Sequence, residues 1–194
     1  MYRTAFPVVL SCILLTGCQD LSGLFDANSP DCTIVEPAPA KSDSPSPTAL
    51  EKVADRVEGF GGYFYEGPPG QAANQYSEGT LNVYLLNPSQ QAGKEAQAAL
   101  ADVFDKELAK ADLKVLQGQY TYTQLNKWYS RASNILSLSG VTLTGLQERK
   151  NRLRYGVKNE RARTCVKQNL ESLDIPLGAV IIEKVEVWSG PAQS

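Results

Sequence analysis

The sequence predicts an α+β fold of two ββαβ units joined by an amphipathic helix, with antiparallel sheets and the helices on one face. The first observation behind this prediction is a repeated pattern. Two strand-like segments, a helical segment and a third strand-like segment occur within residues 57–118 and again within residues 141–188. The second observation is the stretch between these halves, where apolar residues recur most regularly at helical spacing. We therefore expect a single domain over residues 57–188.

The first unit begins with an aromatic, glycine-rich segment, Phe60-Gly-Gly-Tyr-Phe-Tyr65. Its glycines are expected to allow a bulge or tight packing against another segment. Asn87 suits the N-cap of a helix, Pro88 its first turn, and Gln90 would complete a capping box. The expected elements are strands at 60–65, 81–85 and 113–116 and a helix at 88–108, preceded by a short helical lead-in at 50–56.

The middle helix and the second unit are predicted by the same reasoning. Thr121 and Gln124 form a possible capping box at the start of the middle helix, and Gly140 ends it. The apolar stripe of this helix comprises Leu125, Trp128, Tyr129, Ala132, Ile135 and Leu136. In the second unit we expect a strand from Val141, a turn at 149–151, a strand at 152–157, a helix capped by Asn159 and a strand at 180–187.

The start of the chain has the features of an export signal. Arg3 is followed by an apolar run of about ten residues, too short to span a bilayer as a helix. The run ends in Leu14-Leu15-Thr16-Gly17-Cys18, which resembles a bacterial lipobox. The resemblance implies that residues 1–17 are a signal peptide and that Cys18 becomes a lipidated N-terminus. Acyl chains on Cys18 would anchor the protein in a membrane.

A tether is expected between this anchor and the folded domain. Residues 18–56 comprise the lipidated cysteine and a Pro/Ser-rich segment with little to bury, and residues 189–194 are expected to be a disordered tail. Gln19 follows Cys18, in place of the aspartate that resembles an inner-membrane retention signal. The predicted location is the cell envelope, with the periplasmic side of the outer membrane favoured over the inner membrane.

Two of the four cysteines remain for the folded protein. Cys12 leaves with the leader and Cys18 carries the lipid, which leaves Cys32 and Cys165. In an exported protein these two could form a disulfide, which would close a loop worth roughly 4–5 kcal/mol on the chain-entropy model. Alternatively, Cys165 is a small buried apolar residue on the inner face of its helix. The sequence leaves both readings open.

The absence of histidine excludes several functions. The 194 residues contain no histidine, so the chain alone cannot build a Ser-His-Asp triad, a Cys-His dyad or a histidine-ligated zinc site. With two ordinary cysteines remaining, we also expect no structural zinc site. No cluster of carboxylates suggests a catalytic pair, and no sequence motif indicates a cofactor. We therefore expect no catalytic residues, no metal and no cofactor.

The second half of the chain is basic. Residues 113–194 hold twelve basic and six acidic residues, whereas residues 51–112 hold five basic and ten acidic residues. The densest basic cluster consists of Arg149, Lys150, Arg152, Arg154, Lys158, Arg161, Arg163 and Lys167. It could bind an anionic glycolipid, an anionic lipid or an acidic protein. The other reading is a solvated surface that offsets the acidic half. A nucleic-acid partner is not expected for an exported chain.

Three features together resemble a known family of domains. They are the Phe-Gly-Gly-Tyr strand, a Leu-Asn-Val-Tyr-Leu-Leu strand before a helix, and the hairpin that ends in Asn151-Arg-Leu-Arg-Tyr-Gly-Val157. From about Glu58 to Glu186 the sequence resembles the pro-regions of α-lytic protease and the streptogrisins. In that family the domain acts as a foldase and inhibitor of the attached protease. Because no protease sequence follows in this chain, the resemblance implies a separately encoded secreted protease as partner.

The sequence therefore supports two functional hypotheses. The leading one is a non-catalytic, lipid-anchored protein of the cell envelope that acts as a binding or structural module. Its partners would be the membrane, through the lipid anchor, and an envelope protein. The alternative is an inhibitor or chaperone-like domain for a secreted protease, which could bind by adding a sheet edge to the partner's sheet.

Overall fold

The fold is an α+β arrangement of two similar halves. The computed structural model describes residues 32–34, 48–67 and 79–185. The leader, Cys18, most of the predicted tether and the predicted tail lie outside these residues. The first half contains α1 (Ala49–Ala54), β1 (Phe60–Glu66), β2 (Thr80–Leu85), α2 (Gln90–Val103) and β3 (Asp112–Gln117). The second half contains α3 (Tyr122–Arg131), β4 (Val141–Gln147), β5 (Arg152–Val157), α4 (Glu160–Ser172) and β6 (Val180–Lys184).

Each half holds a mixed three-stranded sheet. The strand orders are β1-β2-β3 and β4-β5-β6. The first two strands of each sheet pair antiparallel, and the third pairs parallel to the second. The prediction of antiparallel sheets is therefore wrong for β3 and β6. The reason is the long connection before each third strand, because a helix in that connection lets the chain return in the same direction.

The repeating unit is αββαβ, one helix longer than the predicted ββαβ. The register between the first two strands shifts at the corresponding place in both sheets, between Phe60 and Gly62 and between Val141 and Leu143. Helix α1 precedes the first sheet just as α3 precedes the second. The middle helix is therefore the first element of the second repeat. We call residues 48–67 and 79–118 the first lobe, and residues 32–34 and 119–185 the second lobe.

The folded part begins earlier than residue 57, where the sequence placed its start. Thr48 caps α1 and forms a capping box with Glu51, in which each side chain accepts a hydrogen bond from the other residue's backbone N–H. Val53 is fully buried in the first core, and Val57 is 3% exposed. The lead-in helix is thus part of the domain, because its apolar residues pack into the core instead of lying in a tether.

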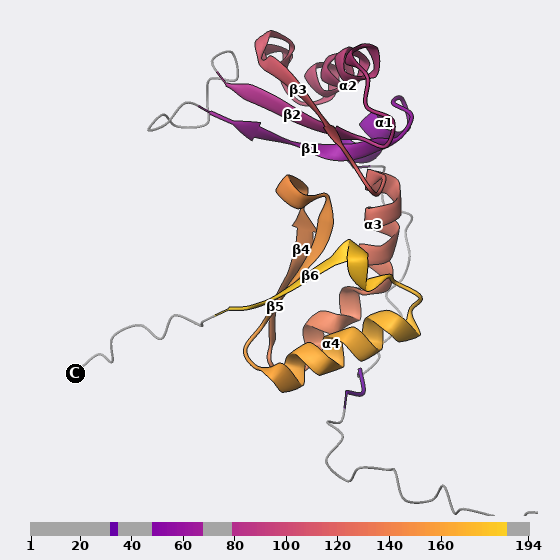
Figure 1. Ribbon diagram of the computed structural model, residues 1–194, viewed down its shortest axis with the longest axis vertical. Helices are drawn as coiled ribbons and strands as arrows, with labels where there is room; N and C mark the ends of the chain where they lie inside the picture. Colours follow the sequence, from indigo (N-terminus) through magenta and orange to yellow (C-terminus); the bar gives the residue numbers. More distant parts are fainter. Residues whose placement is uncertain (1–31, 35–47, 68–78, 186–194) are drawn as a thin grey trace, which may run out of the picture. The chain divides into compact units, whose positions relative to one another are not determined.

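In the first lobe, α1 and α2 cover one face of the sheet (Figure 1). Helix α2 begins after Ser89, whose side chain accepts a hydrogen bond from Ala92 N, so the prediction of Asn87 as N-cap is wrong. The helix also ends at Val103, before the predicted Leu108. Asp105 caps a separate 3₁₀ turn at Lys106–Lys110 that places Leu108 in the core. A break after Val103 therefore lets the chain bury Leu108 before it enters β3.

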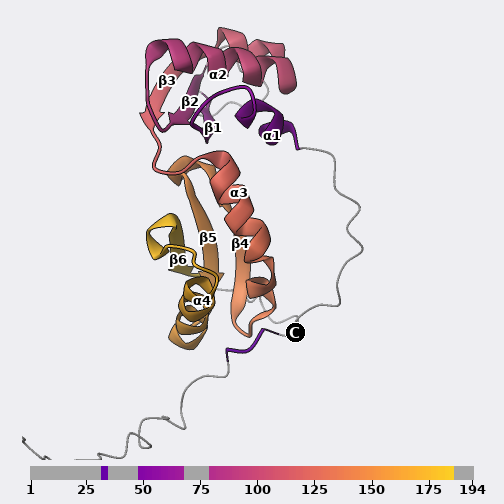
Figure 2. The same cartoon turned by 90° about the vertical axis from the view of Figure 1, so that its right-hand side faces the viewer.

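In the second lobe, α3 and α4 lie on the same face of the sheet (Figure 2). The helix predicted from Thr121 up to Gly140 is α-helical only to Arg131 and continues as a 3₁₀ helix at Ser133–Ser137. Asn159 caps α4 as predicted, with its side chain accepting from Ala162 N. The second core contains the inward residues of β5 together with residues of α3 and α4, namely Leu125, Leu153, Tyr155, Val157, Val166 and Leu170.

Asn151 joins the two lobes. It lies in the hairpin between β4 and β5, has a left-handed backbone (φ 51°) and is 2% exposed. Its Oδ1 accepts hydrogen bonds from Gln119 N (2.9 Å) and Tyr120 N (3.0 Å), and its Nδ2 donates to Gly61 O (2.7 Å) and Tyr120 O (2.9 Å). A Cβ at Gly61 would lie 3.0 Å from Asn151 Nδ2 and 2.9 Å from Tyr120 O. The predicted role of the Gly61 segment in tight packing is therefore confirmed.

The second core contains a buried polar pair. Tyr155 is fully buried and lies opposite Thr144 in the antiparallel pairing of β4 and β5. Neither the Tyr155 hydroxyl nor Thr144 Oγ1 forms a hydrogen bond of normal geometry within the described ranges. Burial raises the pKa of Tyr155 from 10.0 to about 12, an effect that the Thr144 hydroxyl partly offsets. The cause is that the phenolate cannot be solvated in the core.

Tyr155 should make the protein less stable at high pH. Because folding raises the pKa of Tyr155, the folded state holds the phenol proton more tightly than the unfolded chain does. The free energy of unfolding therefore has its full value below pH 10 and falls as the pH rises from 10 towards about 12. A two-unit shift corresponds to roughly 2–3 kcal/mol. We expect the free energy of unfolding to fall less between pH 8 and high pH in Tyr155→Phe than in the wild type. Urea unfolding of both proteins at each pH measures this difference. An identical pH dependence in both proteins would contradict this assignment.

Candidate functional site

Cys32 and Cys165 form a disulfide in the structure. The Sγ atoms are 2.04 Å apart, and the bond joins residues 133 positions apart in the chain. Cys165 lies on α4 and is 5% exposed, and Cys32 and Ile34 pack against the second core. Asn169 Nδ2, one turn further along α4, donates to Cys32 O at 3.0 Å. The 32–34 segment is therefore held on α4 by a covalent bond, a hydrogen bond and apolar packing.

The predicted basic cluster does not form a single surface. Arg149 and Lys150 lie in the turn between β4 and β5, Arg152 and Arg154 on β5, Lys158 after β5, and Arg161, Arg163 and Lys167 on α4. Leu153 and Tyr155 point into the second core, so the alternation along β5 directs Arg152 and Arg154 to the opposite face. The cluster is therefore divided between the two faces of the sheet.

Four of these arginines have partners within the protein. Arg149 Nη1 is 2.7 Å from Glu66 Oε1, and its guanidinium lies 4.9 Å from the centre of the Phe64 ring. The guanidinium of Arg152 stacks on the Tyr120 ring, 5.0 Å from its centre. Arg154 forms a salt bridge with Glu183. Arg163 forms a salt bridge with Glu160 and donates a hydrogen bond to Ile182 O. These contacts favour the reading of a charge-balancing surface for this part of the cluster.

The remaining basic residues are exposed. Lys150, Lys158, Arg161 and Lys167 form no salt bridge with any residue in the described ranges. Lys158 and Arg161 flank Asn159, the N-cap of α4, so they lie at the same end of that helix. Two cations are therefore available for an external anion close to the disulfide.

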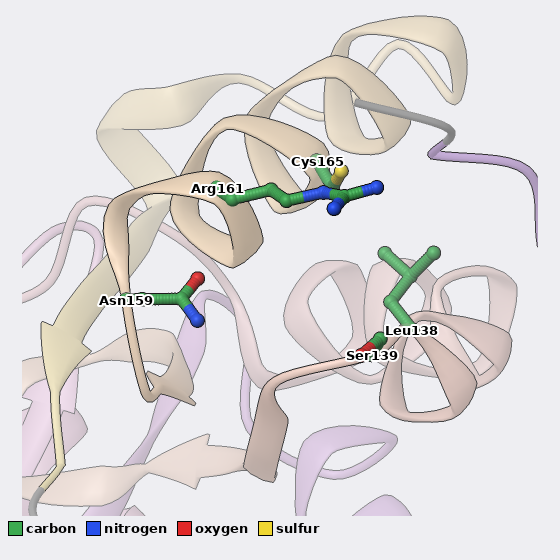
Figure 3. A pocket seen from close by; sticks show the side chains of 5 residues that line it. All are labelled: Leu138, Ser139, Asn159, Arg161 and Cys165. Atoms are coloured by element: carbon green, nitrogen blue, oxygen red, sulfur yellow. The ribbon is translucent and has the colours of Figure 1, made fainter. Parts of the chain in front are cut away.

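A pocket of about 200 Å³ lies beside Arg161. It is lined by Leu138, Ser139, Asn159, Arg161 and Cys165. Figure 3 shows the Arg161 side chain reaching along α4 past Cys165 towards Leu138, with Asn159 at the turn before the helix. The lining offers a guanidinium, an amide and a hydroxyl, which can hydrogen-bond a small polar or anionic group. It contains no acid–base pair, since the hydroxyl of Ser139 has no carboxylate or imidazole beside it in the lining.

Sequence reasoning missed the role of Asn151. It placed the residue in the turn of a hairpin, and the left-handed backbone there agrees with the tolerance of asparagine for that conformation. The burial and the four hydrogen bonds depend on segments 31 and 90 residues away along the chain. No local pattern in the sequence indicates such contacts.

Two comparisons with known proteins identified no similar protein. No protein-family model matches the sequence, and a search of curated proteins finds no match. Within the described ranges, no three histidine, cysteine or acidic residues are grouped so that they could hold a metal ion. No helix in the same ranges is long and apolar enough to cross a membrane.

Proposed function

We propose that this chain is a non-catalytic, lipid-anchored protein of the cell envelope that acts as a binding or structural module. The observation that carries the proposal is the segment ending in Cys18, with a basic residue, an apolar run and two small residues before the cysteine. The first 17 residues are an export signal, and Cys18 bears the lipid that holds the folded lobes at the membrane.

The disulfide supports export. Stable disulfides form in oxidising compartments such as the bacterial periplasm and are rare in the cytosol. The bond between Cys32 and Cys165 joins the start of the described chain to a helix of the second lobe. A protein that depends on such a bond is suited to the compartment that the leader specifies.

The composition supports a role in binding and not in catalysis. The chain contains no histidine, and four of the predicted basic-cluster arginines already have partners within the fold. The pocket beside Arg161 provides groups that bind and none arranged to transfer a proton. The alternative, a domain that serves a secreted peptidase, stays a prediction from the resemblance, since the contacts described above do not favour a peptidase over another protein.

Replacing Cys18 should abolish lipidation of the protein. We expect Cys18→Ser, produced in a diderm bacterium, to move from the membrane pellet to the soluble fraction or to accumulate as uncleaved precursor. The matched control is Cys12→Ser, because Cys12 lies within the leader and should have no role after cleavage. Radiolabelled palmitate should mark the wild type and the control but not Cys18→Ser. Equal labelling of all three proteins would contradict the proposal.

A further inference from the structure

We propose that the end of the second lobe carrying the disulfide, Lys158 and Arg161 lies against the anionic head groups of the membrane in which Cys18 is anchored. This inference rests on the proposed lipid anchor. It goes further because it names the face of the domain that meets the membrane and the chemistry that holds it there. Three observations support it: the position of the disulfide, the distribution of charge and the two basic side chains without salt bridges within the described ranges.

The disulfide brings the anchor to one end of one lobe. Cys32 is bonded to Cys165 on α4, and Cys18 precedes Cys32 by fourteen residues. Fourteen residues span at most about 50 Å in any conformation. Without the bond, the first capped helix would begin at Thr48, thirty residues after Cys18 and up to about 105 Å away. The disulfide thus halves the greatest distance between Cys18 and its first attachment to the folded protein, and that attachment is on α4.

The charge of the second lobe suits an anionic surface. Residues 119–185 hold eleven basic and five acidic residues, whereas the described residues of the first lobe hold six basic and nine acidic residues. An anionic membrane therefore attracts the second lobe and repels the first. This attraction acts in the same direction as the covalent attachment through Cys32.

Lys158 and Arg161 provide the local contact. Both are exposed and neither forms a salt bridge within the described ranges, although Glu160 lies between them in sequence. Glu160 is engaged with Arg163 at 3.3 Å, which leaves the two cations uncompensated by that carboxylate. Arg161 also lines the same pocket as Cys165. Arg161 therefore lies close to the point at which the anchor-bearing segment is attached, and Lys158 precedes it at the same end of α4.

Photo-cross-linking in vesicles tests this orientation. The full lipidated protein would carry benzoylphenylalanine at Ser139, which is exposed and lines the Arg161 pocket, or at Ala98, an exposed residue on α2 of the first lobe. Each form is reconstituted into phosphatidylcholine vesicles with or without phosphatidylglycerol. We expect lipid cross-links from position 139 in the anionic vesicles and few from position 98.

The charge-reversed variant identifies the cause. In the position-139 protein, Lys158→Glu with Arg161→Glu should lower cross-linking by about thirtyfold, because each of the two basic residues contributes roughly 1 kcal/mol, or about fivefold, at an anionic surface. Equal cross-linking from positions 139 and 98, or no effect of the charge reversal, would overturn the inference alone. Protein that fails to float with the vesicles would overturn the lipid anchor and this inference with it.

Discussion

Replacing Asn151 with alanine should lower the free energy of unfolding by about 3–5 kcal/mol. The substitution leaves Gln119 N, Tyr120 N and Gly61 O without their buried partner, and each unsatisfied buried group costs about 1–3 kcal/mol before water enters. It also places alanine in a left-handed backbone conformation (φ 51°) without the polar side chain that lets asparagine adopt it. This strain lowers the free energy of unfolding by about 1 kcal/mol more. Urea unfolding of a soluble chain that begins at residue 19 measures the change.

Two further variants separate the causes of that loss. Asn151→Asp keeps nearly the same shape and an acceptor for the two backbone N–H groups, but it turns a carboxylate oxygen towards Gly61 O and Tyr120 O. We expect it to destabilise the protein at least as much as alanine at neutral pH. Asn87→Ala, at an exposed asparagine that does not cap α2, should change stability by less than about 0.5 kcal/mol. Similar values for Asn151→Ala and Asn87→Ala would refute the assigned role of Asn151.

Reducing the disulfide should have the second large effect. Cross-linking residues 133 positions apart removes entropy from the unfolded chain worth about 5 kcal/mol at 25 °C on the chain-entropy model. Reduction also frees Cys32 and Ile34 to leave the second core, which adds to the loss. We expect a reductant to shift the urea midpoint of the soluble chain strongly downward.

The control for this experiment is a chain without the bond. In a protein that begins at residue 19, Cys32 and Cys165 are the sole cysteines. The double variant Cys32→Ser, Cys165→Ala should unfold near the midpoint of the reduced wild type and should not respond to reductant. A shift below about 1 kcal/mol on reduction of the wild type would show that the bond contributes little to folding.

Local periodicity was sufficient to predict most elements of this fold. Leu153, Tyr155 and Val157 alternate with Arg152 and Arg154, and the structure buries the first set as that alternation requires. The boundaries were less predictable where several residues could serve the same role. Both Asn87 and Ser89 can cap a helix, and in the structure Ser89 does so by accepting a hydrogen bond from Ala92 N.

The contacts between distant segments could not be predicted. The Arg149–Glu66 ion pair and the Asn151–Gly61 hydrogen bond join residues 83 and 90 positions apart. Neither leaves a periodic pattern, because each depends on how the two lobes meet. The basic cluster is continuous in the sequence but not in the structure. The alternation of side chains along β5 and the position of α4 place its members on two faces of the sheet. The parallel third strands likewise depend on how each helix crosses over its sheet.

We propose that an anchor at Cys18 reaches the second lobe through the bond between Cys32 and Cys165. The most direct test is peptide mapping by mass spectrometry of the protein extracted from membranes without reductant. We predict an N-terminal peptide that begins at Cys18 and carries a diacylglyceryl group, and a second species in which the Cys32 and Cys165 peptides are linked. An unmodified N-terminus at another residue, together with free thiols at both cysteines, would contradict the account.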